Sequence, residues 1–140
     1  MSLTLAIDTA TEYLVLGLES QNQSLERQMH LGRTHAERIA LEVQQLFADA
    51  GLVFKAEKLV LGLGPGSYTG LRVGASYALG LARAWSVPLL GVSTLEGVAA
   101  RTDGLVAAAL EATDGVLRII LASPGEGLTI DGVSAWWNRD

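Results

Sequence analysis

Residues 58–88 read KLVLGLGPGSYTGLRVGASYALGLARAWSVP, and this stretch decides the fold. It joins an apolar strand pattern at Lys58–Leu63 to a helix that we expect over Gly70–Trp85, through a turn of closely spaced glycines. Pro88 marks the end of that helix, because the residue before a proline avoids helical backbone. A strand that leads through a short turn into a helix is the first part of a parallel crossover. The stretch therefore predicts an α/β fold.

The residues before this stretch predict a meander of strands and one helix. Apolar runs that are joined by short turns, as in an antiparallel meander, occupy Ser2–Asp8, Tyr13–Glu19 and Ser24–His30. Thr34 and Glu37 then form a capping-box pattern at the start of a helix, and Gly51 ends it. The apolar residues that recur at helical spacing between these signals are Ala36, Ile39, Ala40, Val43, Leu46, Phe47 and Ala50.

The residues after Pro88 continue the alternation of strand and helix for a short distance. Leu89–Val92 predicts another strand, and a short helix is expected from Ser93 to about Arg101. Because strands alternate with helices here, we expect parallel strands to extend the antiparallel meander. Val106–Leu110 and Val116–Ala122 suit a hairpin, and Ser123–Asp140 is interpreted as a loop and a tail.

Composition narrows the class of protein. Hydrophobic residues make up 49% of the 140 residues and charged residues 18%, which is typical of a folded globular chain. There is no cysteine, so disulfides and thiolate metal sites are excluded. The net charge is −5 and the basic residues form no cluster, unlike the basic footprint of nucleic-acid binders. We expect a cytoplasmic protein that has no membrane segment and meets RNA only indirectly.

The glycine-rich turn admits two interpretations. Backbone N–H groups between a strand and a helix can bind a phosphate, and Asp8, Thr9, Ser67 and Thr69 are the side chains placed to assist. The turn has neither the Lys-Ser/Thr pair of a Walker A loop nor the spacing of a dinucleotide fingerprint. Ser67 and Thr69 suit helix capping equally well, and Asp8 suits capping of the turn that follows it. Both interpretations stay open.

Catalytic and metal chemistry find little support. The run Gly66-Ser-Tyr-Thr-Gly70 is one residue too long for a nucleophile elbow, so we reject hydrolase chemistry at Ser67. His35 is a single histidine in the first turn of a helix, with Ile39 where a second metal ligand would stand. We expect no catalytic residue and no metal site.

The helix Gly70–Trp85 is apolar on nearly every side. The residues Gly70, Gly74, Ala78 and Ala82 form a stripe with almost no side chain, which permits close approach of another backbone. Large apolar side chains cover most of the remaining surface, and a helix that is apolar all round must be buried all round. A partner protein is the expected cover for the side that the sheet leaves free, and Leu41 on the preceding helix is expected to extend this patch. The alternative cover is the C-terminal segment of the chain.

With these residues in view, the sequence resembles the bacterial TsaB (YeaZ) family of the actin-like ATPase superfamily. Four motifs carry the resemblance: Ala6-Ile-Asp-Thr-Ala-Thr11, His35-Ala-Glu37, the run Gly62–Gly74, and Gly91-Val-Ser-Thr-Leu-Glu96. The run Gly62–Gly74 is the most specific of them. The resemblance implies a ribonuclease H-like, actin-like lobe at residues 1–103, followed at 104–140 by a reduced remnant of a second lobe. The acidic-Ala-Arg motif that opens the second lobe in most members is represented at best by Glu111-Ala-Thr113, which lacks the arginine.

The resemblance also implies a function. Members of the family act in the biosynthesis of threonylcarbamoyladenosine beside the anticodon of tRNA. They are non-catalytic partners of a paralogue, TsaD, which holds its metal with paired histidines on the helix that matches Thr34–Ala50. An ATPase, TsaE, joins them, and members of the family self-associate through the same helices. The older description of the family as glycoproteases has no support in these residues.

The resemblance places the partner interface on the two helices. The residues expected there are His35, Arg38, Leu41, Gln45, Gly70, Leu71, Val73, Gly74, Tyr77, Ala78 and Leu81. No cofactor is expected, because an actin-like nucleotide site lies between two lobes, so that ATP or ADP would bind weakly or at a partner interface. The rival hypothesis is a nucleotide-using kinase or ATPase built on Asp8, Thr9 and the loop Gly64–Gly70.

Overall fold

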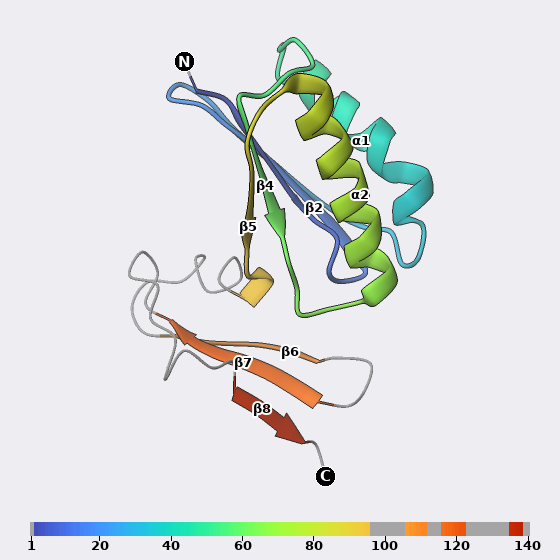
Figure 1. Ribbon diagram of the computed structural model, residues 1–140, viewed down its shortest axis with the longest axis vertical. Coiled ribbons are helices and arrows are strands. Elements are labelled where there is room, and N and C mark those ends of the chain that lie inside the picture. Colours follow the sequence, from blue (N-terminus) through green and yellow to red (C-terminus); the bar gives the residue numbers. More distant parts are fainter. Residues whose placement is uncertain (1, 96–105, 112–115, 123–134, 139–140) are drawn as a thin grey trace.

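The computed structural model describes residues 2–95, 106–111, 116–122 and 135–138. Five strands form one mixed sheet in the order β3-β2-β1-β4-β5, and both long helices lie side by side on one of its faces (Figure 1). The elements of this unit are β1 Thr4–Asp8, β2 Tyr13–Glu19, β3 Ser24–His30, α1 His35–Asp49, β4 Lys58–Gly62, α2 Tyr68–Trp85 and β5 Leu89–Val92.

The sheet has the topology that the sequence predicts. β1 pairs antiparallel with β2, and β2 pairs antiparallel with β3, so these three strands form the meander. β4 pairs parallel with β1 on the other side, and β5 pairs parallel with β4. The two parallel pairings are connected through helices that cover the same face, which confirms the α/β lobe.

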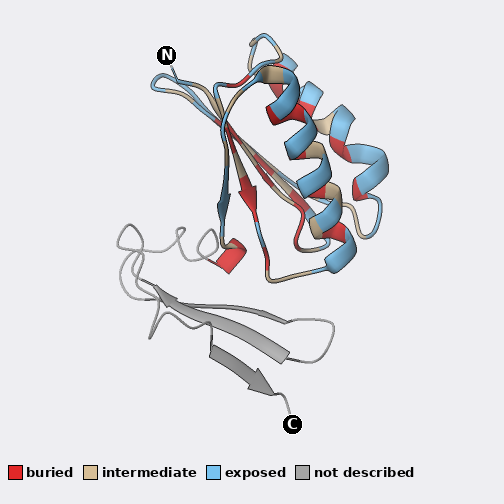
Figure 2. Cartoon of the chain, viewed as in Figure 1, coloured by how far each residue is buried: buried red, intermediate tan, exposed pale blue. Residues whose placement is uncertain are grey.

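The core lies between the sheet and the two helices (Figure 2). Residues alternate along β1, β2 and β4 so that every second side chain is buried, as expected for strands with one covered face. At one end of the core, Phe47 of α1 and Trp85 of α2 meet Phe54 edge to face. The fully buried large side chains are Phe47, Leu5, Ile7, Leu14, Leu16, Leu46, Leu59, Leu95, Val43 and Thr9.

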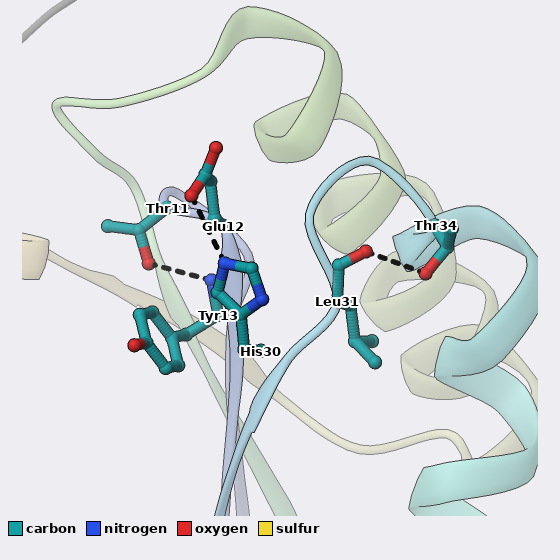
Figure 3. Close-up of polar contacts among 6 residues, drawn as sticks. All are labelled: Thr11, Glu12, Tyr13, His30, Leu31 and Thr34. Atoms are coloured by element: carbon teal, nitrogen blue, oxygen red, sulfur yellow. Dashed lines mark hydrogen bonds and ion pairs between the residues drawn. The ribbon is translucent and has the colours of Figure 1, made fainter.

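The start of α1 differs from the prediction. Thr34 is the residue before the helix, but its side chain makes no capping hydrogen bond, so the predicted capping box is wrong. The Thr34 hydroxyl instead donates to the Leu31 carbonyl at 2.7 Å (Figure 3), because the backbone of Thr34 is not extended and its hydroxyl turns back toward the preceding loop. Ala36 and Ala40, which the spacing placed on the buried stripe, are exposed.

The three described segments after residue 105 form a second, antiparallel sheet in the order β6-β7-β8. β6 spans Val106–Glu111 and β7 spans Val116–Ala122, which confirms the predicted hairpin strands; the turn between them lies outside the described residues. β8, at Ala135–Asn138, pairs with β7, so the prediction of a structureless tail is wrong for these four residues. The helix expected after Ser93 begins at Thr94, and its continuation to Arg101 lies outside the described residues, as does the predicted lobe boundary at 103/104.

Candidate functional site

The glycine-rich turn packs against the loop that follows β1. The Ser67 backbone N–H donates to the Ala10 carbonyl at 2.8 Å, and a Cβ atom at Gly66 would lie only 2.2 Å from the same oxygen. The two loops therefore touch backbone to backbone, and glycine is required at position 66 for that approach. This contact places the start of α2 directly beside the end of β1.

Thr9 continues this contact into the first turns of α2. Its side chain is completely buried, and its hydroxyl donates to the Gly70 carbonyl at 2.6 Å. A Cβ atom at Gly70 would lie 2.4 Å from the Thr9 carbonyl oxygen, and one at Gly74 would lie 2.3 Å from the Thr9 hydroxyl oxygen. Gly70 and Gly74 thus allow α2 to lie directly on the end of β1.

This contact changes the interpretation of the small-residue stripe. Gly70, Gly74, Ala78 and Ala82 are all buried in the core of this chain, where the sequence analysis placed three of them at a partner interface. The spacing correctly indicated a close backbone approach, but the backbone that approaches is that of the chain's own β1 loop. The part of α2 that is free for a partner lies on its other side.

The side chains proposed to contact a phosphate take structural positions. Asp8 accepts from the Ala10 N–H at 2.8 Å and so caps the turn after β1. Ser67 is the N-cap of α2 and accepts from the Gly70 N–H at 3.1 Å. Thr9 is buried as described, and Thr69 is an exposed residue of the first helical turn.

Several backbone groups of the turn are also engaged within the chain. The Gly64 N–H donates to the Thr94 hydroxyl, and the Thr94 N–H donates to the Gly64 carbonyl, both at 3.0 Å. The Leu71 N–H donates to the Ser67 carbonyl at 2.8 Å. An anion at this turn would therefore have to displace existing hydrogen bonds, which favours the interpretation of the turn as a structural connection.

His35 lies in the first turn of α1, only 4% exposed, and its Nε2 atom is buried without a hydrogen-bond partner among the described residues. Ile39, one turn later, is buried in the core. The described residues contain no group of three or more histidine, aspartate or glutamate side chains placed to hold a metal ion.

A polar cluster joins the end of β3 to the start of β2 and the loop before it. His30 at the end of β3 contacts Glu12 at 3.2 Å and packs edge to face on the ring of Tyr13 (Figure 3). The Thr11 hydroxyl accepts from the Tyr13 N–H at 3.2 Å. The side chains of His30 and Glu12 are 58% and 74% exposed, so this cluster is a solvated surface feature.

A groove between α1 and α2 forms a concave surface of the described residues. Its volume is about 600 Å³. We call it the α1–α2 groove, and its lining residues are Ala36, Ile39, Tyr68, Thr69, Arg72, Val73, Ser76 and Tyr77.

On α2, the lining residues of the α1–α2 groove form rows at helical spacing. Tyr68, Arg72 and Ser76 form one exposed row on the side of α2 away from the glycine stripe, and Val73 and Tyr77 form the next row, which is partly buried against the core. Tyr68 is 75% exposed, so most of its side chain is accessible to solvent. Tyr77 is half-buried in the wall, and this burial raises the pKa of its phenol.

The predicted interface residues differ in where the structure places them. Val73 and Tyr77 line the groove, and Leu41 is 60% exposed on α1. Two more lie on the outer surface of α1, where Arg38 pairs with Glu42 at 2.6 Å and Gln45 donates to Asp49 at 2.8 Å. Leu71 is partly buried beside Gly64. The residues that are buried within this chain are His35, Gly70, Gly74, Ala78 and Leu81.

Sequence reasoning missed most of the groove. Tyr68, Arg72 and Ser76 share one side of α2, and that i, i+4, i+8 spacing was visible in the sequence. The contribution of Ala36 and Ile39 was not visible, because it depends on how α1 lies beside α2.

Comparison with known proteins identifies the family. The family described as TsaD, tRNA N6-adenosine threonylcarbamoyltransferase, matches residues 11–117. The tRNA threonylcarbamoyladenosine biosynthesis protein TsaB of Haemophilus influenzae is 36% identical over 96 residues, which cover 68% of this chain and 41% of the relative. The chain belongs to the TsaB (YeaZ) family. TsaB of Escherichia coli is 39% identical over 92 residues, covering 65% of this chain and 40% of the relative.

Solved structures agree with this membership of the TsaB family. A Pseudomonas aeruginosa protein described as similar to the peptidase YEAZ superposes with a TM-score of 0.89 at 31% identity, covering 99% of this chain and 67% of that one. YeaZ of the same organism gives a TM-score of 0.81 at 30% identity, covering 96% and 73%. The chain spans about half or less of the curated relatives it matches, for example 51% of an uncharacterized Mycobacterium tuberculosis protein to which it is 36% identical.

Neither long helix in the described residues has the length and apolar character needed to cross a membrane.

Proposed function

We propose that this chain is a non-catalytic partner in the biosynthesis of threonylcarbamoyladenosine in tRNA, and that it docks on a TsaD-like catalytic paralogue through the α1–α2 groove. Its membership of the TsaB family and the names of its relatives in Haemophilus and Escherichia support the pathway. The observation that carries the docking proposal is the groove itself. It combines a largely free Tyr68 ring with the apolar side chains of Val73 and Ile39.

Docking of a partner is favoured because it removes the exposed apolar surface of the groove from water. Interfaces are enriched in tyrosine and arginine and depleted in acidic residues at their centre, which is the composition of this part of α2. Leu41 and Leu79, 60% and 47% exposed, add apolar surface on the same two helices. Each exposed leucine alone is unremarkable. Together with the groove, these two leucines add up to an apolar surface that a protein partner would bury.

The proposal has further components that follow from the family. A TsaE-like ATPase joins the complex, the chain self-associates through the same helices when the catalytic paralogue is absent, and tRNA is held by other components. The complex works in the cytoplasm, where tRNA is modified.

Size-exclusion chromatography and calorimetry with a TsaD-like paralogue from the same source test this proposal. Ala36→Arg places a bulky cation in the groove, and Ala48→Arg is the matched control on an exposed position of the same helix outside the groove lining. We expect the wild type and Ala48→Arg to form the complex and Ala36→Arg to lose it, because a buried unpaired charge costs several kcal/mol. Absence of a complex with the wild-type chain would sink the proposal.

The rival function, a nucleotide-using kinase or ATPase at the glycine-rich turn, is tested by titrating the chain with Mg-ATP. The turn's hydrogen bonds to Ala10 and Thr94 argue against it. Micromolar binding together with turnover of ATP would establish the rival and remove the ground for a purely non-catalytic role.

A further inference from the structure

The charges on α2 are all of one sign. Between Tyr68 and Trp85 the helix carries Arg72 and Arg83 and no aspartate or glutamate. The chain as a whole has a net charge of −5, so this helix is a positively charged surface on an acidic protein. Arg72 lies in the wall of the α1–α2 groove, whereas Arg83 lies in the last turn of the helix, outside the groove lining.

The guanidinium group of Arg72 is held at the groove without a carboxylate of its own. Its central carbon lies 5.4 Å from the centre of the Tyr68 ring, an arrangement that orients the planar group by cation–π attraction. Within the described residues, no ion pair joins Arg72 to an acidic side chain, whereas Arg38 on the facing helix is already paired with Glu42. With no acidic partner among the described residues, Arg72 can bind a carboxylate in the two-pronged geometry that arginine favours.

The groove beside Arg72 suits an aliphatic side chain. Val73 and Tyr77 are half-buried and Ile39 is buried at its base, so a branched aliphatic group seated there would complete the removal of these side chains from water. A nucleic acid would be a poor occupant, because its affinity depends on several cations along the backbone and this groove supplies only Arg72. The lining thus favours a protein segment.

We propose that the occupant is a segment of the partner protein that seats an aliphatic side chain in the α1–α2 groove and pairs a carboxylate with Arg72. This inference rests on the proposed function and specifies the chemistry of the partner's surface. The apolar anchor supplies most of the buried area, and the carboxylate selects the orientation of the partner, because leaving the Arg72 charge unpaired in a closed interface is costly.

Calorimetric titration of the TsaD-like paralogue with Arg72→Gln at low and high salt tests this inference. Arg83→Gln is the matched control, because it removes the same charge from the same helix outside the groove. We expect Arg72→Gln to raise the dissociation constant about tenfold to a hundredfold at low salt, and Arg83→Gln to leave it nearly unchanged. We also expect binding of the wild type to weaken from about 0.05 to about 0.5 M salt and binding of Arg72→Gln to depend less on salt.

A double-mutant cycle identifies the carboxylate. Acidic residues on the paralogue are changed to their amides one at a time, and each variant is titrated with the wild type and with Arg72→Gln. We expect one of these changes to weaken the wild type but to have little further effect on Arg72→Gln. Suppose that Arg72→Gln weakens binding but that no acidic residue of the paralogue shows this coupling. The pairing of Arg72 with a carboxylate would then be overturned.

The outcomes separate this inference from the proposed function. If Ala36→Arg abolishes the complex while Arg72→Gln binds as the wild type does, the docking site stands and the carboxylate is wrong. If the wild type forms no complex, both proposals fall. If Arg72→Gln leaves the protein complex intact but reduces retention of tRNA on a filter, the groove binds RNA and this inference is overturned. If Arg72→Gln abolishes only self-association of the chain, the occupant is a second copy, which also overturns it.

Discussion

The close contact between Gly74 and Thr9 makes Gly74→Ala the most informative single change in the core. A Cβ atom at Gly74 would lie 2.3 Å from the Thr9 hydroxyl oxygen and 3.3 Å from the Thr9 Cβ and Cγ2 atoms. Thr9 is completely buried and its hydroxyl donates to the Gly70 carbonyl, so any movement of its side chain strains this hydrogen bond. Either α2 shifts away from β1, or Thr9 turns and loses its hydrogen bond.

The cost of Gly74→Ala in free energy of unfolding can be worked out from these two routes. Overpacking of a tight core costs about 1–3 kcal/mol, and a buried hydroxyl or carbonyl left without a partner costs about 1–3 kcal/mol. Against this, alanine is about 1 kcal/mol better than glycine inside a helix. Once the helix gain is subtracted from the cost of either route, we expect Gly74→Ala to lower the free energy of unfolding by up to about 2 kcal/mol, with urea denaturation as the assay.

Gly80→Ala is the matched control, because it makes the same change on the same helix with nothing within 4 Å of the new methyl group. We expect it to raise the free energy of unfolding by about 0.5–1 kcal/mol. Thr9→Ala removes the atom nearest the new methyl group, so it is expected to destabilise Gly74→Ala less than it destabilises the wild type. If Gly74→Ala and Gly80→Ala had the same stability, the assignment of the glycine stripe to the chain's own core would be refuted.

Three further changes test the rest of the unit. Phe47→Ala, which empties a fully buried position beside Trp85, is expected to cost about 3–5 kcal/mol in thermal or urea unfolding; a loss below about 1 kcal/mol would contradict the packing of this core. Ser67→Ala removes the N-cap of α2 and is expected to cost about 1 kcal/mol, and an unchanged urea midpoint would show that the cap is not needed. The hydrogen bond from Arg27 lowers the pKa of Asp49, so the folded state binds fewer protons than the unfolded state and stability is lost as the pH falls below about 4. Asp49→Asn should therefore flatten this part of the stability–pH curve, and an unchanged curve would count against the pairing.

Much of the fold was predictable because its signals are local. The strands at Tyr13–Glu19, Ser24–His30 and Leu89–Val92 have the predicted bounds, since alternation and turn residues mark strand ends within a few positions. Thr34 shows the limit of local patterns, because its hydroxyl donates to the Leu31 carbonyl in the preceding loop and does not cap the helix. β8 was missed because it has only four residues and no turn signal marks its ends. Its strand structure depends on pairing with β7, which the local sequence does not show.

The candidate site was predictable only in part, because it depends on contacts between distant residues. The stripe containing Gly70 and Gly74 was visible, but its partner Thr9 lies more than sixty residues away, so no local pattern indicates which backbone approaches. Leu41 was correctly expected to be exposed, since it lies off the helical stripe. Arg72 became a candidate only when α1 was seen to complete the groove in which it lies.

The central claim is that the α1–α2 groove is the surface on which the catalytic paralogue docks. Nuclear magnetic resonance of the labelled chain, titrated with the unlabelled paralogue, tests it most directly. The account predicts that the resonances that shift or broaden most belong to Ala36, Tyr68, Arg72 and Ser76, with those of Ala48 and of the exposed Glu12–His30 cluster little affected. Changes concentrated at Glu12 and His30, with the groove unaffected at saturation, would contradict it.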